Sequence, residues 1–324
     1  TPALSSAASD VYKRQGLDLA KAIGAGLAKS AVAVTVDGEQ RDLLDVLPEN
    51  SSVAIITIES EEGLEIMRHT LTAQVLAKAI KNLYSDSKLA IGPTIENGFY
   101  YDVSTDTPIS VEDLPKIENE MKRILERKSN IHKSLHSEKD AKKIFKDKGE
   151  IFKVEIIDDA DQDDNFQIYT NSDEDFIDLC RGPHLPDLSF IGAFKLTKVS
   201  GAYWKGDSSN KMLTRIYGTA WRNEKELQEH LKSIEEAEKR DHRKIGKDMD
   251  LFHFQDEAPG MVFWHPKGWT IYSTLKSYMS DMQKKSDYKE INTPSVIDRK
   301  LWEKSGHWDK YRENMFITEI DEEH

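Results

Sequence analysis

The sequence predicts an α+β fold. Apolar residues at helical spacing run along one side of residues 63–84, and a second helical stripe follows residue 223. Between these two stretches lie short β-rich runs at 152–157, 166–170 and 196–204. This mixture of long helices and short strands is typical of an α+β domain.

The N-terminal elements are a short helix, a hairpin and a further strand. Residues 17–23 have the pattern of a small amphipathic helix that ends at Gly24. Residues 31–36 form a β-rich run, and the Asp-Gly pair that follows is a hairpin signal. Residues 53–58 predict a buried strand.

The later elements follow from turn and cap signals. Residues 88–103 predict a strand, a turn and a second strand. Because proline cannot donate a backbone hydrogen bond, the next helix begins just before Pro115. Asn223 and Glu226 have the spacing of a capping box, so a further helix begins there and runs to Gly246.

Length and composition describe an ordinary water-soluble protein of two or three domains. The 324 residues are 32% charged and 38% hydrophobic, and no apolar run approaches the ~20 residues of a membrane helix. A single cysteine excludes an intrachain disulfide and fits a reducing compartment, so we expect a cytoplasmic protein. The net charge of −13 argues against nucleic-acid binding by the whole surface. Residues 122–148 nevertheless carry ten Lys or Arg, which indicates either a local RNA-binding face or a solvated surface.

The clearest chemical motif is the loop Asp178-Leu-Cys-Arg-Gly-Pro-His184. It places the only cysteine, Cys180, four positions before His184. Pro183 disfavours the helical conformation at Gly182, so the thiol and the imidazole lie on a tight loop. Such a pair can bind a metal, take part in acid–base chemistry or contact a polar substrate. The alternative is a buried structural cysteine beside an incidental histidine.

Several longer motifs, together with this loop, resemble the threonyl-tRNA synthetases. They stand in the order of that family at 88–102, 178–184, 198–207, 217–221, 240–246, 257–265 and 301–308. The resemblance implies an unreliable leader at 1–15, a partial TGS domain (a small ubiquitin-like module) at 16–60, a tRNA editing domain at 61–222, a linker helix at 223–246, and a truncated class II catalytic domain with an antiparallel sheet at 247–324.

The resemblance also implies an editing chemistry. Threonine differs from serine by one methyl group, which a binding pocket can use for only about 1–3 kcal/mol, so a second, hydrolytic site is needed to remove serine from tRNA. The residues that match the family's editing site are His184, Cys180, Lys153, His69 and Asp178 as catalytic groups, with Tyr100 and Gln74 as substrate contacts.

The helix that carries His69 has one residue more than the family pattern. The family has two histidines four positions apart, whereas here Gln74 stands five positions after His69. Residues five apart lie about 140° apart around an α-helix, so only a π-helical turn brings both to one face. Either such a turn directs His69 into the site, or the histidine is lost from it.

The resemblance implies ATP, threonine and tRNA as ligands of the full-length enzyme, a homodimer through the catalytic domain, and a catalytic zinc ion whose ligands lie beyond this chain. At the editing site His69, Cys180 and His184 are candidate metal ligands, but we expect no metal there because a neutral glutamine is a poor fourth ligand.

Two other functions stay open. The first is a stand-alone deacylase that clears seryl-tRNA in trans, against which the linker helix and the start of a catalytic domain count. The second is a non-enzymatic TGS-type RNA-binding or regulatory module, against which the long editing motifs count.

Overall fold

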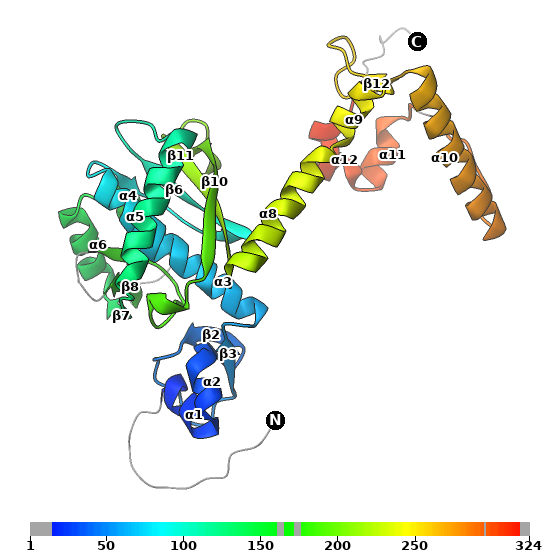
Figure 1. The fold of residues 1–324 in the computed structure, drawn as a ribbon. Coiled ribbons are helices and arrows are strands. Elements are labelled where there is room, and N and C mark those ends of the chain that lie inside the picture. Colours follow the sequence, from blue (N-terminus) through cyan, green and yellow to red (C-terminus); the bar gives the residue numbers. More distant parts are fainter. Residues whose placement is uncertain (1–14, 161–164, 172–175, 295, 318–324) are drawn as a thin grey trace. The chain divides into compact units, whose positions relative to one another are not determined.

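The structure, a computed structural model, describes residues 15–160, 165–171, 176–294 and 296–317 (Figure 1). It divides into two compact units, the first ending at Glu235 and the second beginning at Glu236. Helices and antiparallel sheets occur together, which confirms the predicted mixture of helices and strands. No helix of the described residues is long and apolar enough to cross a membrane.

The N-terminal part of the first unit is a small module of two helices and an antiparallel sheet of order β2-β1-β3. Val36 pairs with Glu39, and the two turn residues, Asp37 and Gly38, have positive φ (51° and 91°), so the predicted hairpin is confirmed. Of the predicted buried strand, only Ile56 is fully buried. The elements are α1 (Gly16–Ile23), α2 (Ala25–Ser30), β1 (Ala31–Val36), β2 (Glu39–Asp42) and β3 (Val53–Thr57).

The described part of the predicted leader is Gln15, which forms a bridge with Val46 and donates its N–H to Asp18. This residue therefore belongs structurally to the module. The rest of the predicted leader, residues 1–14, lies outside the described residues.

The central sheet has the order β10-β11-β6-β4, and one of its faces is covered by helices (Figure 1). Phe99, Tyr101 and Val103 of β6 alternate onto this covered face and are fully buried in the main core. The helix that contains Pro115 begins at Leu114, just before the proline, as predicted. The sheet is formed by β4 (Lys88–Leu89), β5 (Thr94–Ile95), β6 (Gly98–Ser104), β10 (Ala193–Tyr203) and β11 (Met212–Trp221), and the helices are α3 (Glu61–Thr70), α4 (Ala77–Leu83), α5 (Leu114–Glu126) and the π-helical η1 (Leu71–Leu76) between α3 and α4.

A smaller antiparallel sheet of order β7-β8-β9 packs beside α6 and α7. The strand predicted at 152–157 is wrong, because this stretch forms α7. Its alternation of apolar and polar residues resembled a strand, but the helix is buried on two sides: Phe152 packs against Trp204, and Ile157 packs with Phe145. The elements are β7 (Ile131–His136), α6 (Glu138–Asp147), α7 (Ile151–Asp158), β8 (Phe166–Asn171) and β9 (Ile177–Leu179).

The predicted linker helix is interrupted rather than continuous. Asn223 Oδ1 accepts the N–H of Glu226 (3.0 Å), so the predicted cap is present and α8 (Glu224–Lys239) begins there. Asp241 then caps a separate helix, α9, by accepting the N–H of Arg243 (2.8 Å). The prediction that Gly246 ends the helix is wrong, since α9 (His242–Asp248) continues past it.

The second unit contains a two-stranded sheet and several further helices. It gives only a small antiparallel sheet in the described residues, so the class II catalytic domain stays a prediction. The elements are β12 (Phe252–His253), β13 (Phe263–Trp264), α10 (Pro266–Lys285), α11 (Arg299–Lys304) and α12 (His307–Tyr311).

Candidate functional site

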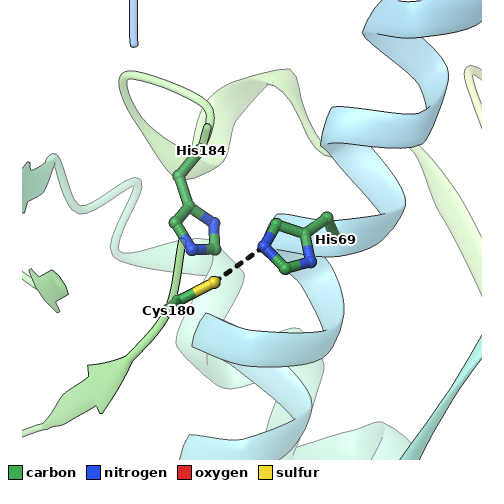
Figure 2. A group of neighbouring side chains, drawn as sticks. All are labelled: His69, Cys180 and His184. Carbon is green, nitrogen blue, oxygen red and sulfur yellow. Dashed lines mark hydrogen bonds between the residues drawn. The ribbon is translucent and has the colours of Figure 1, made fainter. Parts of the chain in front are cut away.

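The extra residue of the long helix is absorbed by a π-helical turn, η1, which is one of the two alternatives that the sequence left open. α3 continues into η1, and the helix resumes as α4 without a break. His69 stands in the last turn of α3, and its Nε2 lies 2.9 Å from Sγ of Cys180 (Figure 2). The first of the two alternatives is therefore found, because His69 points into the site.

His69, Cys180 and His184 form one group, which we call the His–Cys cluster (Figure 2). One ligand atom from each residue lies within 4.8 Å of the others. The two imidazole rings are stacked, with centroids 4.6 Å apart and an interplanar angle of 14°. Two stretches of chain, one with His69 and the other beginning 111 positions later at Cys180, thus bring two imidazoles and a thiol together.

The loop that carries Cys180 and His184 follows directly after β9. Gly182 has φ +65°, a left-handed conformation that glycine adopts without strain. A Cβ at this position would lie 2.1 Å from Oη of Tyr169, so no larger residue fits without a shift. The N–H of Gly182 also points to Sγ of Cys180 (3.4 Å). Local backbone geometry therefore fixes where the thiol stands.

Thr70, the residue after His69, contacts the other histidine. Its Oγ1 accepts the N–H of Leu185 (2.9 Å) and lies 3.1 Å from Nδ1 of His184. Its contact with His184 could not be predicted from the sequence. There Thr70 is marked only by its position beside His69, where it takes the place of the first family histidine if the motif is aligned from Gln74.

The N-terminal module reaches the same loop through Asp42, at the end of β2. The backbone N–H of His184 donates to its Oδ1 (2.8 Å), and the hydroxyl of Tyr169 donates to its Oδ2 (2.7 Å). Lys133 forms an ion pair with the same carboxylate (2.7 Å). These side chains, with Leu185, also line a cavity of about 180 Å³ beside His184. The sequence analysis did not predict this contact, because it joins stretches that no local pattern connects.

Lys153 and Asp178, both predicted as site residues, form a buried ion pair. Their Nζ and Oδ1 atoms are 2.6 Å apart, and the two side chains are 4% and 3% exposed. Burial raises the pKa of Asp178, and the Lys153 ammonium opposes that shift. Lys153 also lies 3.5 Å from the carbonyl oxygen of Leu179, the residue before Cys180. The pair therefore places an ammonium and a carboxylate next to the cluster.

The electrostatics of the cluster favour neutral imidazole at His69. Burial lowers its pKa, while the Asp178 and Asp42 carboxylates act in the opposite direction and the Lys153 ammonium lowers the pKa further. A neutral imidazole keeps one nitrogen lone pair, and it can accept a proton.

Two predicted substrate contacts do not join this group. Tyr100 packs instead against Tyr217 (5.8 Å between centroids), with Arg215 3.8 Å over its ring. Its neighbour Tyr101 lies on the opposite face of β6, where its hydroxyl lies 3.4 Å from Asp178 Oδ2. Tyr100 as a substrate contact therefore stays a prediction, and Tyr101 is the tyrosine whose hydroxyl faces Asp178. The two tyrosines are adjacent, and the phase of the strand decides which of them faces the core.

Gln74 is fully buried in the π-helical turn, and neither atom of its side-chain amide has a hydrogen-bond partner among the described residues. The described residues therefore show no hydrogen bond between Gln74 and the cluster, and its role as a substrate contact stays a prediction.

The donor set of the cluster would suit zinc, for which thiolate and imidazole are usual ligands. Nε2 of His184 is buried and has no hydrogen-bond partner in the described residues, so it could serve as a ligand atom. With three protein ligands, a fourth position would be open, as in catalytic zinc sites. His69, Cys180 and His184 are therefore candidate ligands, and the expectation of a metal-free site stays a prediction.

A family model described as "Threonyl and Alanyl tRNA synthetase second additional domain" matches residues 167–217. This span contains Cys180 and His184 but not His69. Residues 167–217, which include the cysteine–histidine loop, are thus similar to an accessory domain found in two groups of tRNA synthetases.

Comparison with curated relatives shows which of these two groups of synthetases the chain is similar to. The chain is 52% identical to the threonine--tRNA ligase of Hahella chejuensis over 306 residues, which is 94% of this chain and 48% of the relative. It is 52% identical to the threonine--tRNA ligases of Bartonella bacilliformis (94% of this chain, 46% of the relative) and Pelagibacter ubique (96% and 48%). These matches confirm the resemblance to the threonyl-tRNA synthetases. The chain spans about half the length of the curated relatives it matches.

Proposed function

We propose that this chain is the editing region, with flanking segments, of a threonine--tRNA ligase. Its support is the 52% identity to three such ligases and the convergence of His69, Cys180 and His184. The convergence carries the proposal, because two distant stretches supply side chains capable of acid–base chemistry at one place. In this proposal the full-length, cytoplasmic enzyme charges tRNA with threonine using ATP. It has a class II catalytic domain that holds a zinc ion, and this domain forms the interface of a homodimer.

The reaction proposed for the cluster is hydrolysis of a seryl ester at the 3′ end of tRNA. Water adds to the ester carbonyl carbon, and one of its protons passes to an imidazole. The bond to the ribose oxygen then breaks and that oxygen takes up a proton, so serine and uncharged tRNA are released. His69 and His184 are the two candidate bases, because a neutral imidazole has a nitrogen lone pair that can accept a proton.

The remaining site residues have supporting roles in this proposal. Lys153 can orient the water or stabilise the oxyanion, since its ammonium lies beside the residue before Cys180. Asp178 holds that ammonium at 2.6 Å. Cys180 acts as a positioning group, because its Sγ contacts Nε2 of His69 at 2.9 Å.

The tRNA is proposed to contact the basic stretch at 122–148. Some of its cations are already paired, as Lys133 is with Asp42 and Lys142 is with Asp158. Lys143 and Lys146 on α6 are exposed, so they remain suited to phosphate contacts.

The test is single-turnover deacylation of preformed seryl-tRNA by this chain. Replacing a general base should lower the rate by about 10²–10⁴-fold. We therefore compare His69→Ala, His184→Ala and Lys153→Ala with the control His136→Ala, whose imidazole bonds only to Ser134 among the described residues. Rates that are unchanged in all three site variants would place the active site elsewhere.

A further inference from the structure

The imidazole of His184 is held on several sides, so its orientation is fixed. Its ring is stacked on His69 and meets the Tyr169 ring edge-on, with centroids 4.3 Å apart. Its backbone N–H is bonded to Asp42, and the residue is 1% exposed. What remains variable in the neutral ring is which nitrogen carries the proton.

The hydroxyl of Thr70 decides which nitrogen of His184 carries the proton. Thr70 is fully buried, and a hydroxyl has one hydrogen to donate. Its contact with Leu185 cannot take this hydrogen, because a backbone N–H only donates. Among the described residues, the other hydrogen-bond contact of Oγ1 is Nδ1 of His184 (3.1 Å).

A nearby threonine shows the more usual arrangement in a helix. Thr72 gives its hydroxyl hydrogen to the carbonyl oxygen of Arg68, four residues earlier, at 2.6 Å. For Thr70 no such backbone bond is present in the described part of the chain. If Nδ1 of His184 carried a proton, two donors would face Oγ1 and the buried hydroxyl hydrogen of Thr70 would lack an acceptor, which is unfavourable.

We infer that Thr70 donates its hydroxyl hydrogen to Nδ1 of His184 and thereby holds this histidine as the Nε2–H tautomer. Nε2 is buried and has no partner among the described residues. The ring therefore keeps an unused N–H donor, and it lacks a free lone pair with which to accept a proton.

This assignment deepens the proposed function and rests on it for its consequence. An Nε2–H donor stabilises the oxyanion that forms when water adds to the ester carbonyl. His184 then binds the reacting oxygen, and the role of general base falls to His69. Thr70 is a positioning residue, because it acts on the reaction through the tautomer of His184.

The first experiment reads the tautomer and needs no activity. Long-range ¹H–¹⁵N correlation spectra of the histidine-labelled chain distinguish Nε2–H from Nδ1–H by the nitrogen shifts, and His184→Gln assigns the signal. We expect Nε2–H for His184 in the unmodified protein. An Nδ1–H form, which leaves the Nε2 lone pair free for a proton or a metal ion, overturns the inference.

Variants then test whether Thr70 is the cause. Thr70→Val keeps the shape but removes the hydroxyl, so we expect the Nε2–H form to lose its dominance, whereas Thr70→Ser should retain it. Thr72→Val is the matched control, because it removes a buried hydroxyl from the same helix without touching His184. An unchanged tautomer in Thr70→Val overturns the role of Thr70. If that variant does not fold, the spectrum of the unmodified chain still decides the assignment.

The second experiment is single-turnover deacylation of seryl-tRNA. A glutamine at 184 can donate an N–H but cannot act as a base, so His184→Gln should be faster than His184→Ala by about tenfold or more, out of the ~10²-fold that one oxyanion donor supplies. Equal rates in these two variants overturn the donor role. An unmodified chain without any deacylase activity refutes the proposed function, while the tautomer measured by spectroscopy stands or falls separately.

Discussion

Replacing Lys153 by methionine should destabilise the first unit strongly, because it leaves the buried carboxylate of Asp178 without its ion-pair partner. Asp178 is 3% exposed and is paired with Lys153 at 2.6 Å, so solvent cannot take over the role of the ammonium. Removing one partner of such a pair costs about 3–5 kcal/mol. Asp178 also accepts the N–H of Leu179 (2.9 Å) and lies near the Tyr101 hydroxyl, so we expect the lower part of this range.

The loss should depend on pH in a defined direction. The pKa of Asp178 is already raised by burial, and removing Lys153 raises it further. A carboxyl group whose pKa is higher in the folded protein than in the unfolded chain stabilises the fold at low pH. That contribution is lost as the pH rises through the folded-state pKa. The difference between Lys153→Met and the unmodified chain should therefore be largest near neutral pH and shrink in acid.

Denaturant unfolding followed by circular dichroism at several pH values measures both effects. Lys205→Met is the matched control, because Lys205 pairs with Asp159 at the surface, where the side chains are 43% and 60% exposed, and such pairs contribute about 0–1 kcal/mol. A loss in Lys153→Met no larger than in this control, or a loss that grows as the pH falls, would refute the reasoning.

Three further predictions follow from the site and its surroundings. Gly182→Ala should destabilise the chain by more than Gly206→Ala in denaturant unfolding, because both positions have positive φ but only the first has an atom within 4 Å of the added Cβ; equal losses would contradict this. Affinity for tRNA should fall by about 10³–10⁵-fold between roughly 50 and 200 mM salt if six to ten phosphates are contacted, and Lys143→Ala with Lys146→Ala should flatten that slope in a titration. If His69 is the base, its pKa lies below the usual ~6.5, so the imidazole is still neutral at pH ~6.5 and the deacylation rate should fall only at a lower pH. A pH–rate profile with an inflection above pH ~6.5 would exclude His69 as the base.

Much of the fold could be predicted because its signals are local. A turn with positive φ at Asp37 and Gly38, a cap at Asn223 and a proline near the start of a helix each act over a few residues. The strand predicted at 152–157 is wrong because apolar and polar residues alternate there as in a strand, while the helix that forms is buried on two sides and has no single apolar face.

The site could be predicted only in part, for a related reason. Counting residues along one helix left two alternatives for His69, of which one required the π-helical turn that is found. The roles of Thr70 and Asp42 were missed because they arise from contacts made 114 and 142 residues away in the sequence. Tyr100 stays a substrate contact implied by the family resemblance, and the sequence does not indicate which of Tyr100 and Tyr101 faces the core.

The π-helical turn lets the chain change its length without changing its architecture. One residue added to a regular α-helix would rotate everything after it by about 100° and advance it by about 1.5 Å, and the apolar face of α4 would leave the core. Here Leu71 and Leu76, at the two ends of the turn, are both fully buried. Deleting one residue between them should therefore return a plain α-helix with both flanks still packed. The glutamine at position 74 replaces the second histidine of the family pattern, whereas the first is kept, because His69 still stands beside Cys180.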